Sequence, residues 1–320
     1  MLKQEINLQV ISIIGASGFI GHHLLSLLAE KDNLEIRVLV YRQKPHISER
    51  GNVRLVEGSL LHPETLEQLL EPGCLVINLV YLAAGSAQEN LEAMDNLARA
   101  CANRGIKRLV HCSTAVVVGE LVADIVDEGS PCRPRTAYEQ TKLAMESRLL
   151  SHASRRFEVA ILRPTAVFGA RGKNLIKLAD SLTKGNQLIN YLKSCIFRNR
   201  SLNLVCVDNV VAALVFLGET ERNVDGEVFI ISDDNAARNN YRDVENMLIQ
   251  KLSLKAYPVP RIPVPVFILG LLLKLAGRPQ SHPTVKFSDQ KLASFGFHKP
   301  MAFEMGVDRF VDGYRNNENT

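Results

Sequence analysis

Apolar and polar positions alternate along the first half of the chain in blocks that predict strands and helices in turn. Short apolar runs ended by glycine or polar residues are typical of buried strands, whereas apolar residues spaced three and four positions apart are typical of helices packed on a sheet. The predicted strands span residues 8–14, 35–40, 53–56, 74–79, 108–112 and 158–162, and the predicted helices span residues 19–30, 63–70, 87–104 and 138–151.

The alternation of strands with helices predicts an α/β fold, in which a doubly wound parallel Rossmann sheet carries helices on both faces. Such sheets bind ligands at the carboxyl ends of their strands, so the chemistry should lie there. After Arg163 the alternation weakens, and residues 171–200 are polar and basic. We expect a Rossmann domain over residues 1–162, to which the chain returns near residues 203–232. A smaller, interleaved C-terminal domain, made mainly of residues 163–320, should bind the substrate.

The most apolar segment, residues 262–277, holds two prolines and Lys274. It falls short of the roughly 20 apolar residues that a membrane-spanning helix needs. It predicts a buried helix, with a wall of the substrate pocket or a shallow membrane contact as alternatives. The N-terminal residues lack the charged and then apolar layout of a signal peptide. We therefore expect a cytoplasmic protein with no transmembrane segment.

The composition is that of an ordinary globular protein, with 46% apolar and 22% charged residues. The formal net charge of +4 is too small to indicate a nucleic-acid-binding protein. The six cysteines form no C-x-x-C pair and are not spaced with histidine as zinc ligands, so we expect free thiols and no metal site. Lys107 and Arg108 are expected to be solvated charges at a strand edge.

Three glycines follow the first predicted strand and open the first predicted helix. Gly15 permits a tight turn, Gly18 lets backbone N–H groups approach a pyrophosphate, and Gly21 allows close helix–strand packing. The pattern is strong because of its place between a buried strand and an amphipathic helix. It predicts an NAD(P) site that also takes in Ser17, Phe19 and Ile20.

The end of the second predicted strand bears on the choice of cofactor. NAD-selective sites place a carboxylate there to bind the ribose 2′-hydroxyl, but residues 40–44 contain none. Arg42 lies in this stretch, and its planar guanidinium can form paired hydrogen bonds to a 2′-phosphate and stack on adenine. The sequence therefore favours NADP(H), with NAD(H) as the alternative.

Tyr138 and Lys142 form a Y-x-x-x-K pattern, and the glycines are spaced G-x-x-G-x-x-G. Together they resemble the short-chain dehydrogenase/reductase superfamily, whose catalytic tyrosine and lysine have this spacing. On a helix the two side chains lie on one face, about one turn apart. Because an adjacent ammonium favours the phenolate, we expect Lys142 to lower the pKa of Tyr138 from about 10.

The segment from Ser113 to Gly119 resembles the S-[ST]-x-x-V-Y-G motif of the extended branch of that superfamily. The resemblance implies that Thr114 hydrogen-bonds the substrate oxygen, with Ser113 as the competing choice. Further matches are Tyr81-Leu82-Ala83-Ala84 for H-L-A-A, Asn90 and Asn96 for the asparagines of N-V-x-G-T-x-N, Leu162-Arg163-Pro164 for L-R-P, Val207-Asp208-Asn209-Val210 for V-D-D-V, and Gly58-Ser59-Leu60 for G-D-L.

These motifs identify the chain as a member of the NAD-dependent epimerase/dehydratase family. Ser59 replaces a carboxylate that touches adenine in the family. The resemblance implies cofactor contacts for residues of these motifs besides the glycine turn: Ser59, Leu60, Leu82, Ala83, Ala84, Asn96, Tyr138, Lys142 and Pro164.

The family commonly acts on nucleotide-diphosphate sugars, so the resemblance implies such a substrate. Ala115 and Val116 follow Thr114, where a dehydratase carries an acid/base pair, and neither can move a proton. An epimerase or a 4-keto reductase is therefore the favoured interpretation. A 3β-hydroxysteroid-type dehydrogenase and a non-catalytic cofactor-sensing protein are the alternatives.

The basic residues of 171–200 lie where substrate should bind. We expect Arg171, Arg198 and Arg200 to bind the diphosphate, and a solvated basic loop is the alternative. Many family members carry an arginine at the position of Leu202, which Arg200 could replace. The helices 87–104 and 138–151 often pair across a dimer axis in the family, so we expect a homodimer.

Overall fold

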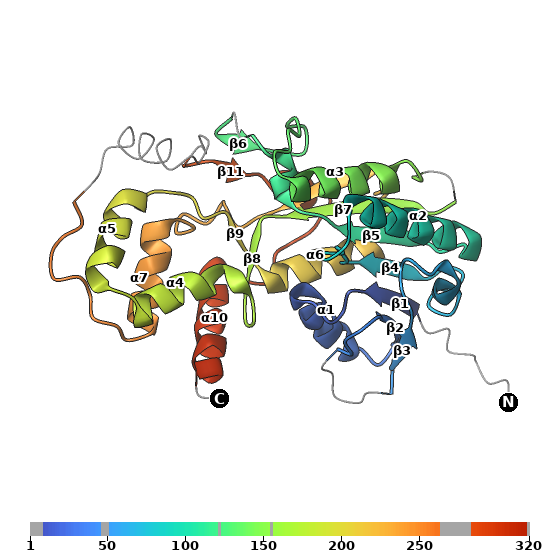
Figure 1. The fold of residues 1–320 in the computed structure, drawn as a ribbon, viewed down its shortest axis with the longest axis horizontal. Helices are drawn as coiled ribbons and strands as arrows, with labels where there is room; N and C mark the ends of the chain where they lie inside the picture. The colour runs from blue at the N-terminus through green and yellow to red at the C-terminus, as the bar shows by residue number, and fades with distance from the viewer. Residues whose placement is uncertain (1–8, 46–50, 121–122, 154–155, 263–282, 319–320) are drawn as a thin grey trace. The chain divides into compact units, whose positions relative to one another are not determined.

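The computed structural model describes residues 9–45, 51–120, 123–153, 156–262 and 283–318. The chain divides into two compact units, each made of segments that are separated in sequence (Figure 1). The first unit comprises Met1–Val117, Pro134–Arg163 and Val211–Phe229, and the second comprises Val118–Arg133, Pro164–Val210 and Ile230–Thr320.

A seven-stranded sheet is the frame of the first unit, with the strand order β10-β7-β5-β4-β1-β2-β3. The pairings β3–β2, β2–β1, β1–β4, β4–β5 and β5–β7 are all parallel. The predicted doubly wound Rossmann sheet is therefore confirmed. The strand order reverses between β1 and β4, which is where such sheets bind ligands. The strands are β1 (Gln9–Ile14), β2 (Leu34–Val40), β3 (Val53–Glu57), β4 (Leu75–Asn78), β5 (Arg108–Cys112), β7 (Glu158–Pro164) and β10 (Glu227–Ile231).

The helices associated with this sheet begin and end where local capping residues allow. Both α2 and α3 start with a capping box, formed by Ser86 with Glu89 and by Thr136 with Glu139. Gly105, with φ of 64°, ends α2 as its position predicted. The helical segments are α1 (Phe19–Ala29), η1 (Pro63–Glu67), α2 (Ala87–Arg104), η2 (Ala115–Val118), α3 (Ala137–Leu150) and α6 (Val207–Glu219).

Helices α2 and α3 pack against each other and against one face of the sheet (Figure 1). Met94 and Leu97 from α2 and Met145 and Leu149 from α3 are fully buried in a shared core with strand residues such as Ile161. Helix α1 instead contacts β1 and β2 without joining this cluster. The apolar face of each helix thus meets one set of alternating strand residues, as a parallel sheet requires.

Arg108 is buried, with 2% of its surface exposed, so the expectation of a solvated charge is wrong. Its guanidinium donates to the carbonyl oxygens of Leu217, Gly218 and Thr220 at the end of α6, at 2.7, 3.1 and 2.8 Å. It also pairs with Glu158. The last carbonyls of a helix have no partners within that helix, and a cation satisfies them. Lys107 does remain solvated, with 45% of its side chain exposed.

The second unit has its own apolar core, around Phe168, Val244, Phe303 and Phe310. Two short parallel pairs, β8 with β9 and β6 with β11, accompany its helices. The elements are β6 (Ile125–Val126), β8 (Ala166–Phe168), α4 (Lys173–Lys184), α5 (Gln187–Phe197), β9 (Leu204–Cys206), α7 (Tyr241–Lys251), β11 (Lys286–Phe287), α9 (Gln290–Ser294) and α10 (Phe303–Glu318).

Residues 171–200 form two helices rather than the solvated basic loop that was one alternative for them. Leu175 and Ala179 bury one face of α4 in the core, and the side chain of Asn186 caps the start of α5. Residues 263–277 of the most apolar segment lie outside the described residues. Within the part of the chain that the structure describes, no helix has the length and hydropathy to cross a membrane.

Candidate active site

The glycine turn between β1 and α1 requires its glycines at two positions. Gly15 has a φ of +94°, a conformation that side chains with a Cβ rarely adopt. A Cβ on Gly21 would lie 2.1 Å from the carbonyl oxygen of Gly15. Gly18 is the N-cap of α1. Among the described residues, no side chain caps this end of the helix, and its first turn contains no acidic residue. The N–H groups of this helix end, beside Phe19 and Ile20, are thus free to meet an anion.

A cavity of about 260 Å³ adjoins this turn. Apolar side chains, including Ile14, Leu39 and Val80, form part of its wall. Arg42, whose guanidinium carbon lies 4.9 Å from the centre of the Tyr41 ring, also lines it. The predicted cofactor residues that line the cavity are Gly15, Ser17, Arg42, Ser59, Leu60 and Leu82. An apolar slot next to a helix N-terminus fits an adenine joined to a pyrophosphate, so these residues suit a dinucleotide.

Buried polar residues hold the walls of this cavity in place. Asn96 is 3% exposed and donates to the carbonyl oxygen of Leu60 at 2.9 Å. Asn90 accepts from the backbone N–H of Leu82 at 2.9 Å and donates to its carbonyl at 3.1 Å. Asn96 therefore acts on the wall and does not line the cavity. Ala83 and Ala84 lie exposed in the turn after Leu82, and Pro164 is the buried last residue of β7.

Lys142 brings α3 to the end of β5. Its side chain is 3% exposed, and its Nζ donates to the carbonyl oxygen of Cys112 at 3.0 Å. Tyr138, one turn earlier on α3, is 41% exposed. Thr114 follows β5 by two residues and is half-buried, and its Oγ1 accepts from the N–H of Val116 at 3.4 Å. Ser113 is buried, and its Oγ has no hydrogen-bond partner among the described residues.

The pKa values at this site are set first by burial. Burial raises the pKa of the Tyr138 phenol and lowers that of the Lys142 ammonium, because each charged form loses water. The predicted lowering of the Tyr138 pKa by Lys142 is therefore wrong for this structure. The desolvation of the phenolate prevails, and the ammonium is directed to the Cys112 carbonyl.

The sequence analysis did not predict two buried contacts that lie near Lys142. His111 lies at the end of β5 with Nδ1 3.1 Å from Nδ2 of Asn78, and burial holds its pKa well below the usual value. Glu146, one turn after Lys142, takes a forked ion pair from Arg163, with N–O distances of 2.6–3.1 Å. The i, i+4, i+8 spacing of Tyr138, Lys142 and Glu146 was a signal that could have found the second contact.

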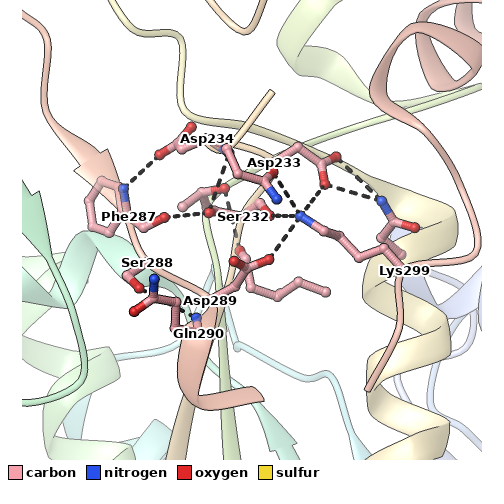
Figure 2. Close-up of polar contacts among 12 residues, drawn as sticks. Ser232, Asp233, Asp234, Phe287, Ser288, Asp289, Gln290 and Lys299 are labelled. Atoms are coloured by element: carbon pink, nitrogen blue, oxygen red, sulfur yellow. Dashed lines mark hydrogen bonds and ion pairs between the residues drawn. The ribbon is translucent and has the colours of Figure 1, made fainter. Parts of the chain in front are cut away.

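Residues 207–210, the V-D-N-V segment of the second unit, make structural contacts through Asn209. Asn209 donates to Asp233 at 3.2 Å and exchanges hydrogen bonds with the backbone of Met301 at 2.9 and 3.0 Å. Figure 2 shows the cluster next to it, in which Lys299 points at Asp233 and Asp289 with N–O distances of 3.2 and 2.8 Å. These contacts join the end of β10 to the segment before α10.

The three arginines expected to bind substrate lie at the ends of α4 and α5. Arg171 precedes α4, is exposed and has a φ of +70°. Arg198 and Arg200 follow α5 and are half-buried. Their carbonyl oxygens accept from the N–H groups of Arg242 and Tyr241 at 3.1 and 2.9 Å, which fixes this turn to the start of α7.

Comparison with known proteins identifies the family. The profile of the NAD dependent epimerase/dehydratase family matches residues 11–232, so the chain belongs to this family and is an enzyme of the extended short-chain dehydrogenase/reductase type. It is similar to curated nucleotide-sugar enzymes, such as those named UDP-glucose 4-epimerase and dTDP-D-glucose 4,6-dehydratase.

Two curated relatives and one solved structure show the range of similar proteins. The 4-hydroxy-2-methyl-3-oxo-4-farnesyl-3,4-dihydroquinoline-1-oxide ketoreductase of Stigmatella aurantiaca is 26% identical over 259 residues, covering 76% of this chain and 73% of the relative. The N-acetyl-alpha-D-glucosaminyl-diphospho-ditrans,octacis-undecaprenol 4-epimerase of Escherichia coli O157:H7 is 24% identical over 335 aligned positions, covering 93% and 92%. The dTDP-glucose 4,6-dehydratase of Bacillus anthracis in complex with NAD has a TM-score of 0.75 at 17% identity, covering 97% and 98%.

Proposed function

We propose that this enzyme is an NAD(P)-dependent epimerase or 4-keto reductase that acts on a nucleotide-diphosphate sugar. The observation that carries the proposal is the joining of α3 to the end of β5 through Lys142, which places the Tyr138–Lys142 pair and Thr114 on adjoining elements. The same sheet end holds the glycine turn and its cavity. The residues proposed to bind the cofactor and to transfer protons thus lie at the edge where parallel sheets bind ligands, which supports the proposal.

The proposed chemistry divides among three side chains. Tyr138 moves a proton on or off the oxygen of the substrate carbon that changes oxidation state. Thr114 donates a hydrogen bond to the same oxygen. Lys142, one turn after Tyr138 on α3, would bind the ribose of the nicotinamide cofactor through its ammonium. A nicotinamide cofactor, when bound, supplies or accepts the hydride.

The residues after Thr114 support an epimerase or reductase over a dehydratase. Elimination of water needs a second acid/base pair, but Ala115 is buried and Val116 is exposed without any ionisable group. The distinction between epimerase and reductase is whether the hydride returns to the same substrate. The same three side chains serve either reaction, so the proposal is an epimerase or a 4-keto reductase.

We propose NADP(H) as the preferred cofactor. A second hollow of about 330 Å³ is lined by Arg42, Lys44, His62 and Ser59, with Glu57 as its acid. Arg42 and Ser59 also line the 260 Å³ cavity, so the two spaces share a wall. Cations at this position suit a ribose 2′-phosphate. The solved Bacillus anthracis neighbour holds NAD, which keeps NAD(H) as the alternative.

We propose that the second unit binds the substrate, with Arg171, Arg198 and Arg200 as candidates for its diphosphate. Arginine forms forked hydrogen bonds to phosphate oxygens better than lysine does. Charge-neutral variants at the three positions should raise the Michaelis constant for a nucleotide sugar.

We also propose that the protein is a homodimer. Light scattering at micromolar concentration tests this, and a single species of 35.5 kDa, the mass of one chain, would count against it.

A second candidate is a dehydrogenase that reduces a lipophilic ketone, as the 3β-hydroxysteroid-type enzymes do. Two observations favour it. The ketoreductase from Stigmatella is named for a farnesylated substrate. In the second unit, Leu188, Ile189 and Leu192 on α5 are 66%, 52% and 51% exposed, which is a large apolar surface for one helix.

The test is a substrate panel with NADPH and with NADH. Purified protein is mixed with 4-keto nucleotide sugars, with 3-keto steroids and with farnesylated dihydroquinoline ketones, and cofactor absorbance is followed. Nucleotide sugars are also incubated with NAD⁺ and examined by NMR for epimers. Turnover of the sugars supports the proposal, and turnover of the lipophilic ketones alone supports the second candidate. Cofactor binding with no turnover across the panel contradicts both and points to a cofactor-sensing protein.

A further inference from the structure

Tyr81 touches both members of the proposed catalytic pair. Its ring centre lies 4.9 Å from that of Tyr138, and the planes meet at 83°, an edge-to-face contact. The Nζ of Lys142 lies 5.9 Å from the centre of the same ring, within the range of a cation–π contact. The family motif H-L-A-A has histidine where this chain has Tyr81. The chain thus places a larger ring at this point.

The main-chain position of Tyr81 is fixed on both sides. Val80 donates its N–H to the buried side chain of Asn78 at 3.1 Å. Leu82 exchanges two hydrogen bonds with the buried side chain of Asn90. Tyr81 itself is half-buried and packs on the core beneath α2 and α3. A ring held by such a turn can restrain a neighbour.

Tyr138 and Lys142 each gain from such a restraint. Tyr138 lies in the first turn of α3, is 41% exposed, and its ring contact among the described residues is with Tyr81. Lys142 is buried with one hydrogen bond, to the Cys112 carbonyl, and forms no ion pair with a carboxylate in the described part of the chain. An aromatic face is therefore a second source of stabilisation for its charge.

We propose that Tyr81 is a positioning residue, whose ring fixes the orientation of the Tyr138 phenol and stabilises the positive charge of Lys142. The proposal rests on the proposed function, because it assigns Tyr81 to the same pair. It requires the ring of Tyr81 and does not require its hydroxyl.

The test compares Tyr81→Leu with Tyr81→Phe, which keeps both ring contacts. We expect Tyr81→Leu to lower kcat by roughly 10-fold, the scale of a lost aromatic contact in a catalytic pair, with the cofactor Kd unchanged. The alkaline limb of the pH profile should also move down by about 0.5–1 pH unit, because loss of the cation–π contact lowers the pKa of Lys142. Tyr81→Phe should match the wild type in both respects.

A second readout does not depend on activity. The rate at which fluorodinitrobenzene labels Lys142 is measured against pH by peptide mass spectrometry, and in Tyr81→Leu the midpoint should fall by the same amount. Unchanged labelling and an unchanged pH profile in Tyr81→Leu overturn the proposal, and so does a Tyr81→Phe variant as impaired as Tyr81→Leu. If Tyr138→Phe stays active, the proposed function fails, while the labelling experiment still decides the role of Tyr81. Circular dichroism checks that each variant is folded, and Tyr81→Met, which also lacks a ring, replaces Tyr81→Leu if the latter is not.

Discussion

Two lysines, the buried Lys142 in the first unit and the half-buried Lys299 in the second, have opposite surroundings. Lys142 in the first unit is 3% exposed and has one hydrogen bond, to a carbonyl oxygen. Lys299 in the second unit lies between the carboxylates of Asp233 and Asp289, at 3.2 and 2.8 Å. It also donates to the Ser232 carbonyl at 2.8 Å and to Asn235 at 3.1 Å. Figure 2 shows Asp233, Asp289 and Ser232 around its ammonium.

The partners of each lysine indicate whether its charge serves the fold or the chemistry. A charge that is fully neutralised by carboxylates and carbonyls holds segments together, and removing it leaves its partners unpaired. A charge buried without a carboxylate is costly to the fold, so its presence is better explained by a reaction that uses it. This contrast supports a structural role for Lys299 and the proposed catalytic role for Lys142.

Lys142→Met gives the largest expected effect of this comparison. Methionine fills a similar volume without the charge, so turnover should fall by roughly 10²-fold or more while the folded protein stays as stable or becomes more stable. Initial rates and thermal unfolding of the same preparation test this. A Lys142→Met enzyme that unfolds at a much lower temperature would reverse the assignment.

Lys299→Met should act in the opposite way. Asp233 and Asp289 lose their shared cation, and the cost of leaving two carboxylates without it is about 3 kcal/mol, somewhat less because the side chain is 20% exposed. Calorimetry should show a lower Tm, and the fraction that remains folded should keep the cofactor Kd of the wild type. Wild-type stability of this variant would mean that the cluster contributes little.

Asp233, which pairs with Lys299, and the adjacent Asp234 also predict a pH dependence of stability. Burial raises the pKa of Asp234 to about 6 from its ordinary value of 3.8, and it also raises the pKa of Asp233. Because the folded pKa exceeds the unfolded one, the folded state binds the proton more tightly, and stability falls as pH rises from about 4 to 6. For Asp234 the loss is on the order of 2 kcal/mol. Asp234→Asn should flatten this slope in unfolding measured at several pH values.

Arg42→Ala extends the comparison to an exposed cation and has the smallest expected effect. If Arg42 binds a 2′-phosphate, NADPH affinity should weaken by about 1.5 kcal/mol, the scale of a charged hydrogen bond, and NADH affinity should hardly change. Fluorescence titration with both cofactors measures this. Equal losses for the two cofactors, or tighter wild-type binding of NADH, would assign the site to NAD(H).

Local patterns in the sequence were sufficient to predict the Rossmann sheet. The buried runs from Gln9–Ile14 to Glu158–Pro164 and the helix Ala87–Arg104 were each predicted from contiguous residues. The glycine turn and the placement of Tyr138 and Lys142 on one helix could be predicted for the same reason, because each depends on spacing within one turn or one helix.

Contacts between distant segments could not be predicted in this way. Arg108 is buried because the end of α6, more than a hundred residues later, presents carbonyl oxygens to it. The pKa of Tyr138 is raised by burial, and the helical spacing of Tyr138 and Lys142 could not predict how deeply the phenol is buried. The basic residues of 171–200 led to the prediction of a substrate-binding or solvated segment. They obscured the apolar face of α4, on which Leu175 and Ala179 are buried.

The most direct test of the catalytic assignment is single-turnover hydride transfer by Tyr138→Phe beside the wild type. The variant loses only a hydroxyl, so NADPH should bind with unchanged Kd. With a 4-keto nucleotide sugar that the wild type reduces, the rate of NADPH oxidation should fall by roughly 10²–10⁴-fold, the range of general acid–base catalysis. Tyr191→Phe, which removes a hydroxyl that donates to the Pro260 carbonyl in the second unit, should leave the rate unchanged. A Tyr138→Phe rate near that of the wild type would contradict the assignment.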